Sequence, residues 1–258
     1  MKNVSQGGLL ALQFFSVFPV RRNIEPTPSV VRSCLIWLPV LGFMIGALNA
    51  LVFYGLESFT TWSLLSLVVF TIMVPAICSG GLHLDGLMDS GDAFFSYRDK
   101  PRRLEVMQDP RTGAFGVFVL LAVIILRFVF IYEAFLTDFS VIGFMIIIPF
   151  FSRGVMILLL GHTLSARNSG LSHFFNSHYT LKVTIAVIGL TFMTCAAVSL
   201  LSTSYFAISL VILLASLVAV WGIRVWAIRS FGGITGDVCG ATLEGMETYL
   251  WFIVLLCI

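Results

Sequence analysis

The chain of 258 residues is 59% hydrophobic and only 11% charged, and its mean hydropathy is +1.02. A soluble domain carries about 25% charged residues, so this composition excludes a soluble protein and predicts an all-α, polytopic membrane protein. The length suits a single membrane-embedded domain over residues 1–258, a bundle of six to seven transmembrane helices of about 20 residues each. The net charge of +2 gives no reason to expect a nucleic-acid partner. Five cysteines without a CxxC pair indicate neither a zinc site nor a disulfide framework.

Apolar runs, taken in chain order, predict the positions of the helices. Segment 8–18 is too short to span a bilayer and is expected to lie in the membrane interface. Six spans follow, at 34–56, 61–79, 114–136, 141–161, 182–201 and 205–228. A shorter run at 241–258 is either a seventh span or a re-entrant or interfacial segment.

The connections between these spans alternate in kind. Those at 57–60, 137–140 and 202–204 are short and contain no Lys or Arg. The N-terminal segment and the connections at 80–113, 162–182 and 229–240 are longer and carry the basic residues. Because positively charged loops stay on the cytoplasmic side, the N-terminus and every long connection are expected to face the cytoplasm. The polar site should therefore lie at the cytoplasmic edge of the bundle.

Three aspartates follow the second apolar run. Asp85, Asp89 and Asp92 are spaced i, i+4 and i+7, so a helix would place all three carboxylates on one face. Their repulsion at the edge of a membrane favours a bound cation over a bare solvated helix, and oxygen ligands point to Mg²⁺ or Mn²⁺. His83, just before them, is a ligand, a general base or a packing residue.

A second acidic pair, Glu105 and Asp109, is spaced i, i+4 in a helix that Pro110 should end. This pair could complete a site for one or two divalent ions bridged by a diphosphate. Alternatively, it simply pairs with Arg102 and Arg103 on an exposed face. Arginines of the same connection could hold phosphates, namely Arg98, Arg102, Arg103 and Arg111.

A further polar region lies at 232–247, where Asp237 and Glu244 share one helical face and glycines precede a helix N-terminus suited to a phosphate. Two arginines lie inside predicted spans, Arg127 and Arg153. Each costs about 2.5–3.5 kcal/mol there unless it is paired or hydrated. Arg153, near the cytoplasmic end of its span, is expected to contact a ligand.

These blocks together resemble the cobalamin synthase family, the adenosylcobinamide-GDP ribazoletransferases or cobalamin 5′-phosphate synthases, over nearly the whole chain. The most specific block is GGLHLDGLMDSGDA at 80–93, and RLEVMQDPRTGAFG at 103–116 supports it. Further matches lie at 12–20, 152–154 and 232–241 with Glu244. Departures from the family pattern at Met88 and Pro110 remove no polar group.

The resemblance implies a Mg²⁺-dependent enzyme of the bacterial plasma (inner) membrane that joins adenosylcobinamide-GDP to α-ribazole, or to its 5′-phosphate, and releases GMP. The expected metal ligands are Asp85, Asp89, Asp92, Glu105 and Asp109. Arg111, Arg153, Asp237 and Glu244 are expected to bind the substrate. Asp92, Asp109 and His83 are the candidates for the group that accepts the proton of the attacking hydroxyl. The lipid bilayer is the expected surrounding, and the sequence leaves open whether the protein forms a homo-oligomer.

Three other functions agree less well with this sequence. A CDP-alcohol phosphotransferase combines a DGxxAR block with a GxxxDxxxD block, and the DGxxAR block is not present here. A UbiA-type prenyltransferase needs two aspartate-rich motifs separated by much more chain. A cation transporter would place its carboxylates deep in mid-span, whereas the aspartates and arginines here gather at one edge.

Overall fold

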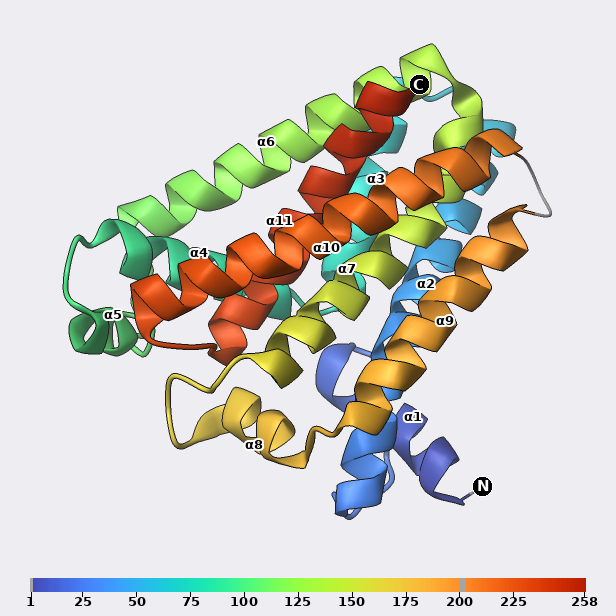
Figure 1. Cartoon of the computed structure of the whole chain (residues 1–258). Helices are drawn as coiled ribbons and strands as arrows, with labels where there is room; N and C mark the ends of the chain where they lie inside the picture. The colour runs from blue at the N-terminus through green and yellow to red at the C-terminus, as the bar shows by residue number, and fades with distance from the viewer. Residues whose placement is uncertain (1, 200–202) are drawn as a thin grey trace.

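The computed structural model describes residues 2–199 and 203–258 and is built from helices (Figure 1). The helices within these residues are α1 (Lys2–Phe15), α2 (Pro28–Phe59), α3 (Leu64–Cys78), α4 (Leu82–Phe95), α5 (Lys100–Val106), α6 (Ala114–Thr137), a 3₁₀ segment η1 (Phe139–Gly143), α7 (Phe144–His162), α8 (Gly170–His178), α9 (Leu181–Ser199), α10 (Thr203–Phe231) and α11 (Gly236–Cys257). Residues 200–202 lie outside the described residues, and with them the end of the predicted span at 182–201 and part of the connection at 202–204.

Six helices in the described residues are long and apolar enough to cross a membrane: α2, α6, α7 with η1, α9, α10 and α11. They confirm the predicted class, an all-α multi-pass membrane protein. The run at 241–258 belongs to a continuous 22-residue helix, α11, which begins earlier than predicted because the Thr235 side chain caps it by accepting from the Val238 amide. α1, with 14 residues, is too short to span, as predicted.

The helix at the predicted span 61–79 is shorter than predicted, because it stops early and the chain turns. α3 has 15 residues, about 22 Å of helix against a hydrocarbon core of about 30 Å. The chain then bends by 92° into α4. Gly80 and Gly81 form the bend with φ of +64° and +75°, a left-handed conformation that favours glycine. α3 and α4 together make a broken span or a re-entrant segment.

The bundle is built around α7, in whose spanning window 78% of residues are buried, against 17% in α6 and in α10. α11 packs against α4, α6, α7 and α10. Figure 1 shows α1, α5 and α8 at one end of the bundle, with the tight turn between α6 and α7 and the C-terminus at the other. This separation agrees with the predicted gathering of the long connections on one side.

Candidate active site

The crossing of α4 and α11 brings the two predicted polar regions together. A Cβ on Gly86 would lie 2.8 Å from the carbonyl oxygen of Asp237, and one on Gly240 would lie 3.0 Å from that of His83. Only glycine lets the two backbones approach this closely. The crossing therefore sets the start of α11, with Asp237, beside the aspartates of α4.

Gly86→Ala is expected to push α4 away from α11. The added methyl group meets backbone atoms that cannot rotate away, and overpacking of this kind costs about 1–3 kcal/mol. Transferase activity and the thermal unfolding midpoint should both fall. Gly245→Ala in α11 is the matched control, because a Cβ there meets nothing within 4 Å. Equal behaviour of the two variants would contradict this account of the crossing.

The aspartates of α4 lie on one helical face, as predicted. Asp89 is within electrostatic range of Asp85, Asp92 and Asp237, and Arg167 supplies the opposing positive charge. Asp85, Asp89 and Asp237 are called the carboxylate cluster below. Arg167 also donates a 2.6 Å hydrogen bond to the carbonyl oxygen of Leu104, which holds the connection after α7 against α5. From the sequence alone, Arg167 indicated only on which side of the membrane the connection at 162–182 lies.

Asp92 has a structural partner of its own. Its two carboxylate oxygens accept hydrogen bonds from the backbone amides of Gly113 at 2.7 Å and Gly116 at 2.8 Å. These amides belong to the N-cap and first turn of α6, where a negative charge is favourable. Asp92 therefore fastens α4 to the start of α6, a contact between segments more than 20 residues apart that the sequence did not indicate.

Asp92→Ala is expected to loosen the start of α6. Losing a side-chain cap costs about 1–2 kcal/mol. Hydrogen exchange at Gly113 and Gly116 should become faster, and Asp92→Asn, which keeps one oxygen acceptor, should show a smaller effect. Unchanged exchange in Asp92→Ala would show that these two hydrogen bonds contribute nothing.

The pair of Glu105 and Asp109 does not share a helix, which corrects the prediction. α5 ends at Val106 because the amides of Gln108 and Asp109 bond to carbonyls three residues back and Pro110 follows. Glu105 pairs with Arg102 at 2.6 Å on an exposed face, as the alternative interpretation expected. Asp109 pairs instead with Arg111 at 2.6 Å, and the hydrogen bonds from Arg111 lower the pKa of Asp109 to about 2.

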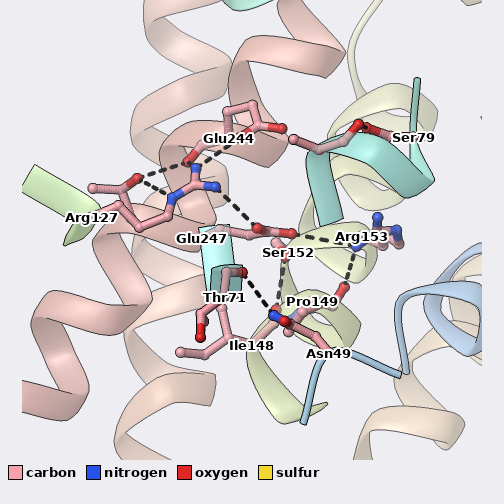
Figure 2. Close-up of polar contacts among 12 residues, drawn as sticks. Asn49, Thr71, Ser79, Arg127, Ile148, Pro149, Ser152, Arg153, Glu244 and Glu247 are labelled. Carbon is pink, nitrogen blue, oxygen red and sulfur yellow. Dashed lines mark hydrogen bonds and ion pairs between the residues drawn. The ribbon is translucent and has the colours of Figure 1, made fainter. Parts of the chain in front are cut away.

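The mid-span arginines form a buried network with two glutamates of α11 (Figure 2). Arg127 contacts Glu244 at 2.8 Å and Glu247 at 3.3 Å. Arg153 contacts Glu247 at 3.5 Å and the carbonyl oxygen of Pro149 at 3.1 Å. All four charged side chains are at most 7% exposed. Two positive and two negative charges thus neutralise one another inside the bundle.

This network meets the requirement that Arg127 and Arg153 be paired, and it engages Glu244 and Arg153, which the sequence predicted as substrate contacts. Arg153 still lies close enough for its charge to act on His83. The roles of Arg127 and Glu247 were missed. Two features of the sequence could have predicted this network. Two mid-span arginines require two acids, and Glu244 and Glu247, three residues apart, share a helical face.

A cavity of about 130 Å³ opens beside the carboxylate cluster. Asp85 and Asp237 line one part of it, and His83, Phe15 and Phe175 line another. His83 is only 4% exposed. Of the predicted site residues, the structure thus gathers His83, Asp85 and Asp237 around one space, with Asp89 in electrostatic range of the two aspartates. Glu105, Asp109 and Arg111 lie in ion pairs outside it.

Within the described residues, no three His, Cys, Asp or Glu side chains stand in a ready-made metal site. Mg²⁺ does not need one, because it keeps several of its waters and is commonly held by one or two carboxylates together with substrate phosphates. The carboxylate cluster offers only oxygen donors and an excess of negative charge, which is the donor chemistry that suits this ion. The metal assignment stays a prediction.

Comparison with known proteins gives a consistent result over the full length. The model of the cobalamin-5-phosphate synthase family matches residues 7–255. An adenosylcobinamide-GDP ribazoletransferase of Geobacillus kaustophilus is 37% identical over 99% of this chain and 97% of that protein. Enzymes of the same name from Geobacillus sp. strain WCH70 and Clostridium botulinum strain Kyoto are 36% and 28% identical, each over 99% of this chain and over 97% and 100% of their own lengths. No solved structure matches the chain.

Proposed function

Because the chain belongs to the cobalamin-5-phosphate synthase family, we propose that it is an adenosylcobinamide-GDP ribazoletransferase. The observation that carries the proposal is the full-length match together with the junction of α4 and α11, where the family-like blocks at 80–93 and 232–241 meet. The acceptor is α-ribazole or its 5′-phosphate. The long basic connections support an orientation in a bacterial plasma membrane with this junction facing the cytoplasm.

In the proposed reaction, the 3′-hydroxyl of the ribazole attacks the phosphorus nearest the corrinoid. A new P–O bond forms, the bond to the bridging diphosphate oxygen breaks, and GMP leaves with the bonding electron pair. The hydroxyl proton passes to a base of the protein. The product carries the corrinoid phosphate on the ribazole, and no oxidant or reductant is required.

Asp85, Asp89 and Asp237 are the residues that would hold Mg²⁺ at the diphosphate. When bound, this ion neutralises negative charge on the phosphate oxygens and on the leaving group. Asp92 lies farther along α4 and is occupied with the α6 amides, so its contribution is to hold the helices in place. Arg167, facing Asp89 and Asp237, limits the repulsion within the cluster.

His83 is the best-placed candidate for the base, because it lines the cavity beside Asp85, whereas Asp109 is outside the cavity lining and is paired with Arg111. His83→Gln is expected to lower the turnover number about 10²-fold, the scale of a lost general base, without changing either KM greatly. The measurement is steady-state GMP release over a range of pH. A His83→Gln enzyme with the wild-type turnover number and pH profile would remove His83 from this role.

A cation transporter needs carboxylates that are free to bind ions in mid-span. The carboxylates of α11 that lie deep in the bundle, Glu244 and Glu247, are both paired with arginines. Asp85, Asp89 and Asp237, which form no ion pair within the residues that the structure describes, lie instead at the α4–α11 junction. This arrangement favours chemistry at one edge over passage of ions.

The test is GMP release from adenosylcobinamide-GDP by detergent-purified protein, with and without α-ribazole and Mg²⁺. Release that requires both additions, with a cobalamin as product, is the expected result. Folded protein that releases no GMP with any divalent metal would overturn the proposal.

A further inference from the structure

The cavity beside the carboxylate cluster has an aromatic side that the chemistry of phosphate transfer does not explain. Phe15 of α1 and His83 of α4 are nearly parallel, with ring centroids 6.5 Å apart and planes 17° from each other. Phe175 of α8 lies 5.6 Å from Phe15 and is almost fully buried. Three helices far apart in sequence thus contribute aromatic rings to one wall.

His83 is the polar member of this wall. It is only 4% exposed, it lines the cavity, and its imidazole makes no hydrogen bond to the residues that the structure describes. A polar ring with so little access to water favours a ligand in the cavity that completes the site. That ligand must offer a hydrogen-bonding atom next to an aromatic or apolar surface.

The size of the cavity limits which ligands can bind in it. An apolar cavity of about 150 Å³ holds one benzene ring, so about 130 Å³ admits one aromatic ring. A bicyclic aromatic base therefore fits with one ring inside the cavity and the fused ring at its open mouth. A flat ring of that kind also gains about 0.5–1.5 kcal/mol for each favourable aromatic contact.

We propose that this cavity binds the aromatic base of the ribazole, so that the ribose lies at the cavity mouth with its hydroxyl between His83 and Asp85. The inference rests on the proposed function, whose acceptor is a nucleoside with a bicyclic aromatic base. The guanine of the donor is also bicyclic, but its polar edge needs several hydrogen-bond partners. The cavity walls away from the carboxylate cluster are mainly apolar side chains, including Leu35, Leu38 and Leu160, and do not offer such partners.

This placement explains the order of groups around the cavity. The base packs against the rings of Phe15 and Phe175, the unpartnered imidazole receives the hydroxyl, and the carboxylate cluster lies on the side from which the donor diphosphate approaches. The acceptor hydroxyl and the reacting phosphorus are thereby brought together at the α4–α11 junction.

Leu171→Trp tests the assignment without disturbing the core. Leu171 lines the cavity from α8 yet is 46% exposed, so a larger ring there fills the cavity and can be tolerated at the surface. Leu181→Trp, at a 68% exposed leucine of α9 outside the cavity lining, is the matched control. A second variant, Phe175→Leu, keeps an apolar side chain and removes only the ring.

Binding of α-ribazole alone is measured first, by calorimetry on the full-length protein in detergent without donor or Mg²⁺. Leu171→Trp should weaken this binding at least about tenfold, with a smaller loss in Phe175→Leu and none in Leu181→Trp. In the full reaction, Leu171→Trp should raise KM for α-ribazole by a similar factor and leave KM for adenosylcobinamide-GDP unchanged.

Folded Leu171→Trp protein that binds α-ribazole as tightly as the wild type would overturn the inference. So would a rise in KM for adenosylcobinamide-GDP alone, which would assign the cavity to the guanine. Wild-type protein that binds α-ribazole in this cavity but releases no GMP would overturn the proposed function and support the cavity assignment.

Discussion

Replacing Asp89 by Asn is expected to lower GMP release from adenosylcobinamide-GDP by at least about 10³-fold. Asp89 is the member of the carboxylate cluster that faces the charges of Asp85, Asp92 and Asp237 together. The amide keeps the shape of the side chain but removes the charge that would attract Mg²⁺ to the diphosphate. Since Asp89 already suffers repulsion from three carboxylates, its neutralisation should leave stability unchanged or slightly improved.

The loss should therefore appear in turnover and in the Mg²⁺ concentration needed for half-maximal rate, while the thermal unfolding midpoint stays at or above that of the wild type. Glu57→Gln is the matched control, because Glu57 is an exposed acid in the last turn of α2, outside the cluster. Near-normal GMP release by purified Asp89→Asn would remove this residue from the metal site. Lost activity with a lowered unfolding midpoint would instead point to a structural role.

Replacing Arg127 by Met is expected to cost about 3–5 kcal/mol of stability, the largest structural effect of any single change considered. The side chain of Arg127 donates to the Glu244 carboxylate, the Glu247 carboxylate and the Thr248 hydroxyl. Without it, two buried glutamates share the single positive charge of Arg153, which contacts Glu247. The measurement is the thermal unfolding midpoint in detergent.

The matched control is Arg102→Met, which removes an arginine–glutamate pair of similar length on an exposed face and should leave the midpoint almost unchanged. Adding Glu244→Gln to Arg127→Met should restore part of the lost stability, because one uncompensated charge is then removed. Strictly additive losses in the double variant would show that the two residues do not act as one network.

Several features of the site were predictable from local spacing. The aspartates at i, i+4 and i+7 lie on one face of α4 because helical periodicity depends only on sequence separation. The same reasoning holds for Asp237 and Glu244 in α11. The same reasoning failed for Glu105 and Asp109, because α5 ends at Val106, before Asp109.

The contacts that the sequence did not indicate share one origin, which is that the partners come from other helices. Glu244 is a predicted substrate contact, and the approach of α6 gives it Arg127. Asp92 is a predicted metal ligand, and the start of α6 gives it two amides. A one-dimensional pattern identifies which groups need partners and leaves the partners undetermined.

The sequence by itself determined the membrane class, five of the six long apolar helices, the side on which the basic connections gather and the family. These properties follow from composition, run length and motif order, because hydrocarbon demands apolar runs with internally satisfied backbone. Only the tertiary structure decided that two glycines bend α3 into α4, that Gly86 and Gly240 let α4 meet α11, and that two arginines and two glutamates close a neutral network. Each of these depends on contact at atomic distance between segments far apart in the chain, where a single methyl group or charge changes the outcome.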